Sequence, residues 1–453
     1  MLSFLLRILC MRRMLLALIL SMAHLSAMAA TTLADFFNLA WSRQIDVAVL
    51  PARLEATSAK TELAKQWFAG APNLALAYRS DQLQRNQGGR EWDVGVAIPL
   101  WLPGESDLLR GLAEQELSLL KKNLYAKQFL FAGQIRSLWW QWQLSRIDVN
   151  EAQRRWQHSQ HLTDDVARRV QAGLLARTDL LQAQSAQAQA LGILTNAESQ
   201  ALQALTSLRE RLPDFQPEIW DGEGEPITVL SESEPMQSIT SPLLLEQHPL
   251  LSALAAEFGL AQGRRNLALV QRYANPEIRI STRADRSMFG ETYIQSSAVS
   301  VRVPLGSDGR ARVRVAEASA EQIQAEVSYL RLAEQLPIWQ AAQAQRWRNA
   351  AQHVQSAQAR ARLAEETRRL LDKSFRLGQT DLPTRLRVEL EAFDAARQAL
   401  RAQVEQAALL SEWRQSLGLL PEMSLPQNAT QIIQQSVTKA ASQPKSAHTN
   451  TKE

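Results

Sequence analysis

Four short segments of the chain alternate apolar and polar residues with the two-residue period of a β-strand. In the first segment Leu74, Leu76 and Tyr78 fall on one side of the predicted strand, and their neighbours fall on the other. Polar runs that contain glycine join the segments in pairs, so the pattern predicts two β-hairpins. The segments cover about residues 72–82, 91–100, 275–285 and 296–305.

The two hairpins are copies of one another. Pro72 and Pro276 open the first strand of each hairpin, 204 residues apart, and Pro99 and Pro304 close the second strand, 205 residues apart. A fixed spacing of this kind indicates a tandem duplication. We assign the two repeats to residues 31–213 and 243–421, joined by an irregular linker at 214–242.

Most of each repeat has the composition of long helices. Long helical sequence extends over about 106–171 and 309–377, and at 1.5 Å per residue each stretch spans roughly 100 Å. Gly173 and Gly378 follow these stretches, again 205 residues apart, and a shorter helix returns after each glycine. The predicted fold class is therefore mainly α, with long antiparallel coiled-coil helices and one β-hairpin in each of two tandem repeats.

Two smaller features of the helical pattern carry expectations of their own. Residues 33–68 predict a single amphipathic helix that ends before Pro72. Pro337 lies inside the second long helix, where its ring and missing N–H predict a kink.

Composition and the two termini indicate an exported protein. Residues 1–30 combine arginines, a short apolar run and small residues, as a cleaved signal peptide does; a permanent membrane anchor is the alternative. Removing them, with three arginines and no acid, takes the net charge from +4 to +1, which argues against nucleic acid as a partner. Cys10 is the only cysteine. The polar tail at 422–453 predicts disorder.

The predicted strands are about as long as strands that cross a bilayer at a tilt. A sheet that packs on a soluble core is the alternative, because alternation is a weak signal in any one segment. Four strands cannot close a barrel, and open sheet edges are not tolerated in lipid. If the strands span a membrane, several copies of the chain must pool them.

The order of these elements, with several short motifs, resembles the TolC-type outer-membrane efflux proteins, and most closely their heavy-metal (CzcC-like) branch. The resemblance covers roughly residues 31–421. The matching motifs are PNLAL at 72–76, IPLWLPG at 98–104, RVQAGLLARTDLLQA at 169–183, FRLGQTDL at 375–382 and SLGLLP at 416–421.

The resemblance implies an outer-membrane homotrimer that pools its strands into a twelve-stranded transmembrane β-barrel above a periplasmic α-barrel. Members are passive, gated ducts, not enzymes. They work with a periplasmic adaptor protein and an inner-membrane pump of the RND or ABC type, in tripartite efflux or type I export. The cargo would be metal ions or small toxic molecules.

Two sets of candidate site residues follow from this resemblance. The helical turns at the periplasmic tip would contact the adaptor. Thr178 and Asp179 can cap one returning helix, and Thr380, Asp381 or Thr384 can cap the other. Thr384 and Arg387 stand where members with a cation-binding constriction carry carboxylates, which leaves Asp381 as the acid at this tip. The tip set is Gly173, Thr178, Asp179, Gly378, Thr380, Asp381, Thr384 and Arg387.

Four strand arginines would line the pore, and the alternative is that they snorkel or pair with Asp93. They are Arg79, Arg279, Arg283 and Arg302.

Other chemistry finds little support in the sequence. His158, His161 and Asp164 have helical spacing that can bind a metal, although solvated side chains are the usual meaning of such spacing. No phosphate loop, nucleophile elbow or paired acid site is present, so we expect no enzyme activity, metal site or cofactor. The rival function is a soluble periplasmic coiled-coil adaptor of the membrane-fusion type, which would need a domain of many short strands beside one helical hairpin.

Overall fold

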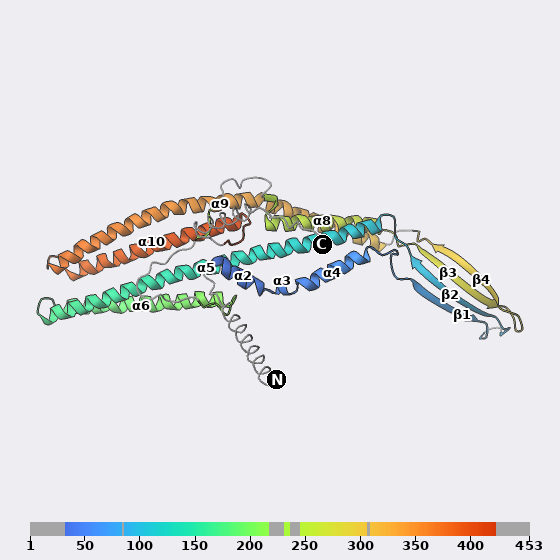
Figure 1. Cartoon of the computed structure of the whole chain (residues 1–453), viewed down its shortest axis with the longest axis horizontal. Helices are drawn as coiled ribbons and strands as arrows, with labels where there is room; N and C mark the ends of the chain where they lie inside the picture. The colour runs from blue at the N-terminus through green and yellow to red at the C-terminus, as the bar shows by residue number, and fades with distance from the viewer. Residues whose placement is uncertain (1–31, 84–85, 217–230, 236–244, 306–308, 423–453) are drawn as a thin grey trace, which may run out of the picture. The chain divides into compact units, whose positions relative to one another are not determined.

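The computed structural model describes residues 32–83, 86–216, 231–235, 245–305 and 309–422. The predicted signal peptide, the tail beyond residue 422 and most of the linker lie outside these ranges. The elements, in chain order, are α2 (Leu33–Ser42), α3 (Ile45–Ala48), α4 (Leu50–Leu63), β1 (Asn73–Ser80), β2 (Arg90–Pro99), α5 (Glu105–Gln171), α6 (Arg177–Arg209), α8 (Pro249–Val270), β3 (Glu277–Arg286), β4 (Ile294–Arg302), α9 (Gly309–Arg376) and α10 (Leu382–Ser416) (Figure 1).

The chain divides into two compact units, and each long helix contributes to both. The first unit contains α2, α6, α10 and the parts of α5 and α9 that follow residues 128 and 338. The second unit contains α3, α4, α8, the four strands and the earlier parts of α5 and α9. In the part of the chain that the structure describes, no helix combines the length and the apolar composition needed to cross a membrane.

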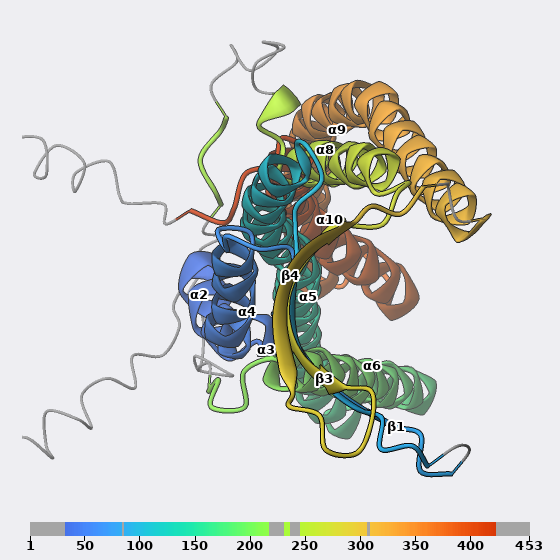
Figure 2. The same cartoon turned by 90° about the vertical axis from the view of Figure 1, so that its right-hand side faces the viewer.

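The strands of the second unit form one antiparallel sheet in the order β1-β2-β3-β4, which leaves β1 and β4 at its edges (Figure 1). Figure 2 shows the same sheet nearly edge-on. The register aligns Leu74 with Val96, Val96 with Ile280 and Ile280 with Val299. Because residues that face each other across a sheet point to the same side, these four residues belong to one apolar face. They are exposed, by between 38% for Val96 and 74% for Leu74.

Two expectations about the helices need correction or comment. Residues 33–68 do not form one helix, because α2, α3 and α4 are separated at Arg43–Gln44 and at Val49. Pro51 explains the second break, since it has no N–H for the carbonyl of Val47 and its ring would collide with that carbonyl. Nothing in the local sequence explains the first break. α9 continues through Pro337, so the proline does not end the helix.

The core of the first unit is aromatic. Phe36 of α2 packs edge-on against Phe215 at 4.9 Å between ring centroids, and Trp142 of α5 packs against the same ring at 5.6 Å. Apolar residues of α6 and α10 complete the cluster around them. This packing places α2 against the middle of α5 and buries Trp139, Trp140 and Trp142.

Glu232, from the predicted linker, is buried beside two arginines. Its carboxylate lies 2.8 Å from Arg136 of α5 and 3.3 Å from Arg414 of α10, and all three side chains are at most 3% exposed. Ser411 donates a third hydrogen bond to it. The segment 231–235 is therefore attached to the helical core through a charge, although its sequence predicts only an irregular linker.

Glu232→Ala should destabilise the first unit strongly, because it leaves the buried Arg136 without its carboxylate and Arg414 with only the exposed Glu422. Breaking a buried pair from one side costs about 3–5 kcal/mol. Thermal unfolding of the purified protein in detergent measures this cost. Glu422→Ala is the matched control, because Glu422 is 60% exposed and contacts the same Arg414 at 2.8 Å. Equal losses from the two variants would contradict the role given to Glu232.

Burial lowers the pKa of His248 in the second unit to about 4, from 6.5. The folded chain therefore keeps this imidazole neutral at a pH where the unfolded chain protonates it. Stability should fall as the pH is lowered from about 6.5 towards about 4, because the unfolded state binds the extra proton in that window. Unfolding midpoints measured across this range should decline less steeply for His248→Gln. An unchanged slope in that variant would assign the decline to other groups.

Candidate functional site

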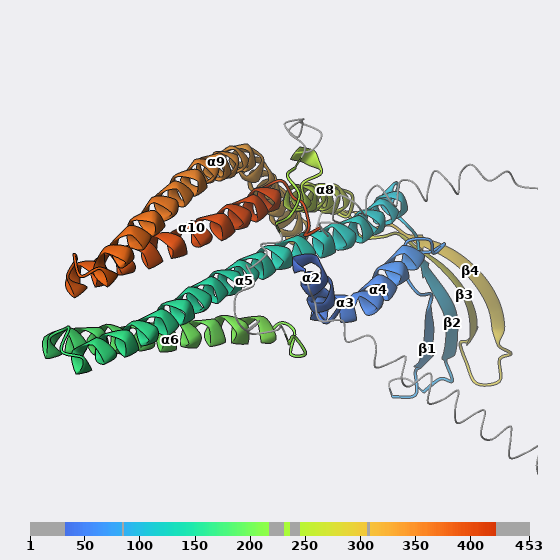
Figure 3. The same cartoon turned by 60° about the vertical axis from the view of Figure 1, so that its left-hand side comes forward.

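The two helical hairpins of the first unit end in turns of the same geometry (Figure 3). Gly173 between α5 and α6, and Gly378 between α9 and α10, both have φ of +73°. At each turn the glycine N–H bonds back to the carbonyl three residues earlier, and the next N–H bonds to the carbonyl five residues earlier. This pair of bonds is a Schellman motif, which satisfies two of the helix's terminal carbonyls. The predicted turn glycines therefore perform equivalent roles in the two repeats.

The capping residues differ from the prediction. The residue at the N-cap of α6 is Ala176, not Thr178 or Asp179. Asp179 stands at the third helical position, where its carboxylate accepts a hydrogen bond from the Ala176 N–H at 3.1 Å. Asp179 thus reaches back to the helix start, and Thr178 lies inside the first turn. The prediction that Asp179 caps a freed N–H is therefore confirmed, whereas Thr178 is not the N-cap residue.

In the second turn Asp381 occupies the N-cap of α10, but its side chain makes no capping hydrogen bond. The Thr380 hydroxyl instead lies 2.5 Å from the hydroxyl of Ser374, which joins the end of α9 to the turn. Thr384 stands at the third position of α10, as Asp179 does in α6. Asp381 and Arg387 are exposed.

An apolar cluster above the turns, which we call the tip cluster, joins the two hairpins. Its buried members are Leu162, Val166, Ala183, Phe375 and Leu382.

Two arginines enclose the ring of Phe375 in this cluster. The guanidinium carbons of Arg385 and Arg169 lie 4.7 Å and 5.3 Å from the ring centroid. Cation–π contacts of this kind are strongest where the cation is partly desolvated. Arg385 also pairs with Asp372 at 2.6 Å, and burial lowers its pKa while Asp372 partly opposes that change. Sequence analysis missed this contact, because Phe375 had no visible partner along the chain.

Further along the hairpins, α5 and α10 meet through charged side chains, in what we call the α5–α10 seam. His158 Nδ1 lies 2.5 Å from a carboxylate oxygen of Glu389. Arg401 donates to Asp148, and Arg397 lies between Asp148 at 4.0 Å and Asp394 at 3.7 Å. A coiled-coil seam is normally apolar at such positions.

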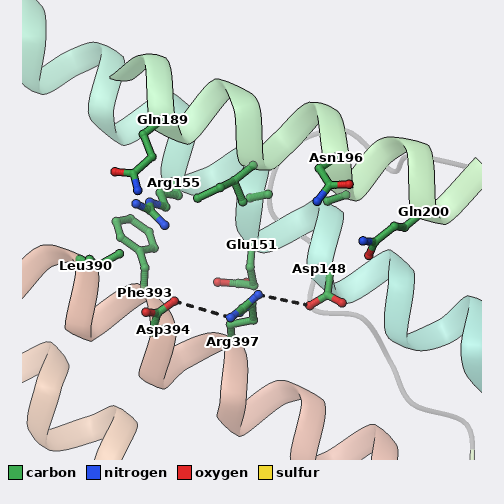
Figure 4. Close-up of a pocket in the computed structure, with 13 residues that line it drawn as sticks. Asp148, Glu151, Arg155, Gln189, Asn196, Gln200, Leu390, Phe393, Asp394 and Arg397 are labelled. Carbon is green, nitrogen blue, oxygen red and sulfur yellow. Dashed lines mark ion pairs between the residues drawn. The ribbon is translucent and has the colours of Figure 1, made fainter. Parts of the chain in front are cut away.

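A cavity of about 490 Å³ lies beside this seam, between α5, α6 and α10. Amide side chains from α6, among them Gln189 and Asn196, line one wall, and the charged side chains of α5 and α10 line the others (Figure 4). Burial raises the pKa of Glu151, which lines the cavity, and Arg154 partly offsets the rise. The seam is therefore polar and loosely filled.

His158 and His161 do not form the metal site that their spacing allows. His158 is bound to Glu389, and among the described residues no group of three or more His, Cys, Asp or Glu side chains is placed to hold a metal ion. The partner of His158 comes from another repeat, which is why spacing within α5 could not reveal it.

In the second unit, the four strand arginines share the face of the sheet opposite to the apolar one. Arg79 pairs with Glu91 at 3.4 Å, and Arg283 pairs with Glu91 at 3.0 Å. Arg279 pairs with Asp93 at 3.1 Å, and Arg302 aligns with Glu277 in the register. The predicted alternative, pairing with Asp93, therefore occurs for Arg279 and, at 3.9 Å, for Arg283, whereas Arg79 pairs with Glu91.

Gly173→Ala and Gly378→Ala should each destabilise the hairpins by about 1–2 kcal/mol, because a Cβ atom disfavours positive φ. A Cβ at either position would meet open space, so the effect comes from the backbone alone. Thermal unfolding measures the change. Gly111→Ala, inside α5 with similar open space, should instead stabilise by about 0.4–1 kcal/mol. A gain in stability at Gly173 or Gly378 would contradict the turn analysis.

No family model and no curated protein matches the sequence. Solved structures do match. The CmeC outer membrane channel of Campylobacter jejuni is 12% identical with a TM-score of 0.65, and the match covers 89% of each chain. The outer membrane protein VceC of Vibrio cholerae is 15% identical with a TM-score of 0.65, over 86% of this chain and 97% of that one.

CusC, whose structures are described in terms of transmembrane channel formation, is 14% identical with a TM-score of 0.67, over 85% of this chain and 92% of that one. At such identities the likeness establishes the fold alone. It agrees with the element order, the four-stranded sheet and the paired helical hairpins. The described chain has the protomer fold of the TolC-type outer-membrane channels.

Proposed function

We propose that the chain is one subunit of a trimeric outer-membrane channel, a passive duct that carries cargo out of the cell without catalysing a reaction. The single observation that carries this proposal is the sheet, which has an exposed apolar face, a charged opposite face and two open edges. Strands of 8 to 10 residues are close to the length required to cross a bilayer at a tilt.

Lipid would cover the apolar face. In hydrocarbon, every backbone N–H and C=O must find a partner within the protein, so β1 and β4 require further strands. Three copies would contribute four strands each and close a twelve-stranded barrel, in which β4 of one copy pairs with β1 of the next. The fold shared with solved outer-membrane channels supports this arrangement.

The charged face would line the pore. It carries four arginines, Arg79, Arg279, Arg283 and Arg302, and four acids, Glu91, Asp93, Glu277 and Asp285. Equal numbers of positive and negative groups make this wall polar without a net charge. We therefore propose a water-filled upper pore in which the arginines are held by acids and exert little selectivity for anions.

The turns at Gly173 and Gly378 would meet a periplasmic adaptor, which connects the duct to an inner-membrane pump that supplies the energy. Support comes from the equivalent geometry of the two turns, because a partner that binds one can bind the other in the same way. Thr178, Asp179, Thr380, Asp381, Thr384 and Arg387 would surround that contact. The cargo class, metal ions or small toxic molecules, rests on the sequence resemblance.

The matched variants Val299→Lys and Ala298→Lys test the proposal, because the two residues are neighbours on β4 and lie on opposite faces of the sheet. A lysine at Val299 would enter hydrocarbon, at a cost of about 2–4 kcal/mol near the bilayer midplane. A lysine at Ala298 would enter the aqueous pore at little cost. Cell fractionation, with gel migration of unheated against heated samples, reports the membrane-inserted trimer.

We expect a heat-sensitive outer-membrane trimer for the wild type and Ala298→Lys, and a depleted one for Val299→Lys. Equal tolerance of both lysines would place the apolar face away from lipid. A soluble periplasmic monomer in the wild type would overturn the channel and favour the adaptor.

A further inference from the structure

The apolar face of the sheet ends in a row of polar and basic residues beside the hairpin turns. The register aligns Ser80 of β1 with Arg90 of β2, and Arg90 with Arg286 of β3. Side chains alternate along a strand, so Arg90 lies on the same face as Val96, six residues further along β2. The two arginines of this row therefore lie on the face opposite to the four proposed pore arginines.

No carboxylate of the described chain neutralises this row. Among the residues that the structure describes, neither Arg90 nor Arg286 takes part in an ion pair. Arg286 Nε donates to the carbonyl of Gly88 at 3.2 Å, and its guanidinium carbon lies 5.1 Å from the ring centroid of Tyr293. Glu91, next to Arg90 in the chain, pairs with arginines of the opposite face. Like charges directly opposite each other destabilise a sheet, so the row favours an anion from outside the chain.

The rows next to the arginines become steadily more apolar. Tyr78 stands opposite Trp92, with 4.5 Å between the ring centroids, and both rings are exposed, by 48% and 44%. The following row pairs Leu76 with Val94, which are 66% and 39% exposed. Tyrosine and tryptophan concentrate at the boundary between lipid headgroups and hydrocarbon. The face therefore presents charge, aromatic rings and aliphatic groups in the order in which a lipid presents its headgroup, boundary region and acyl chain.

The basic row lies at the end of the sheet that is remote from the helices. β1 and β3 follow α4 and α8, and β2 and β4 lead into α5 and α9, so all helices connect at the other end of the strands. In the proposed channel the helices lie in the periplasm. The arginine row would then lie at the outer leaflet of the outer membrane.

We propose that Arg90 and Arg286 bind the phosphate of a phosphate-bearing lipid in the outer leaflet, whose acyl chains cover the aromatic and aliphatic rows. Guanidinium groups suit this role because they donate two parallel hydrogen bonds to one phosphate. The phosphate would also relieve the repulsion between the two arginines. This inference rests on the proposed channel, for which it identifies a lipid partner.

Each site lies within one chain, because β2 and β3 are neighbours in the same sheet. A trimer would therefore bind up to three such lipids, and binding would not require a residue from a second copy. A ligand that binds only the folded protein also stabilises it. The lipid should accordingly raise the unfolding temperature of the trimer.

Lipid binding to the full-length trimer, purified in detergent, tests the proposal. The probes are lipid A, a glycolipid with two phosphates, and the same lipid A after removal of its phosphates. Native mass spectrometry counts the lipids bound to each trimer. The test variant is Arg90→Gln with Arg286→Gln. The matched control, Arg331→Gln with Arg348→Gln, removes two exposed arginines from α9 instead.

We expect the wild type and the α9 control to retain up to three phosphorylated lipids per trimer. The affinity of the Arg90→Gln, Arg286→Gln variant for this lipid should fall by about tenfold or more, because hydrogen bonds to charged groups are lost. Lysines at both positions should restore part of the affinity, since they keep the charge and lose the forked donor geometry. The dephosphorylated lipid should bind equally weakly to all four proteins.

Three outcomes would overturn the inference while the channel stands. In the first, the wild-type trimer retains both lipids equally, a comparison that decides the question even when the glutamine variant does not assemble. In the second, the α9 control loses as much affinity as the test variant. In the third, inorganic phosphate raises the unfolding temperature as much as the lipid does, which would assign the site to free phosphate. A wild type that forms no outer-membrane trimer, seen by fractionation before lipid is added, overturns the proposed function as well.

Discussion

The requirement that every strand edge find a partner governs the interpretation of this chain. Its sheet has four strands, with β1 and β4 at the edges and an apolar face exposed on β1 to β4. Water could satisfy the edges but would be in unfavourable contact with the apolar face, whereas lipid favours the apolar face and excludes open edges. Pooling of strands between copies, as we propose, would satisfy both conditions.

The two helical hairpins of the first unit pack on each other within the chain, chiefly through α5 and α10. Aromatic packing around Phe36 and Trp142 and the tip cluster around Phe375 hold the hairpins together at two levels. Between them lies the charged α5–α10 seam with its cavity.

Much of the fold could be predicted from the sequence because its signals are local. Alternation identified all four strands, and the glycines identified both tip turns, since positive φ excludes most other residues. The prediction was wrong where the local sequence is compatible with more than one backbone conformation. It treated residues 33–68 as one helix, and it included Thr178 in the cap of α6, where Asp179 supplies the hydrogen bond. The adaptor contact of the tip residues and the pore-lining position of the strand arginines remain predictions.

The sequence by itself determined which segments are helices or strands, the internal duplication and the position of the turns. These features depend on residues that are close together in the chain or on a repeated sequence pattern. Only the tertiary structure decided which distant residues meet. It placed Glu232 between Arg136 and Arg414, His158 against Glu389, and Phe375 between two arginines. It also paired the strand arginines with acids across the sheet. Such contacts join positions up to some 230 residues apart, and no period or motif encodes them: they arise from the packing of whole helices and strands.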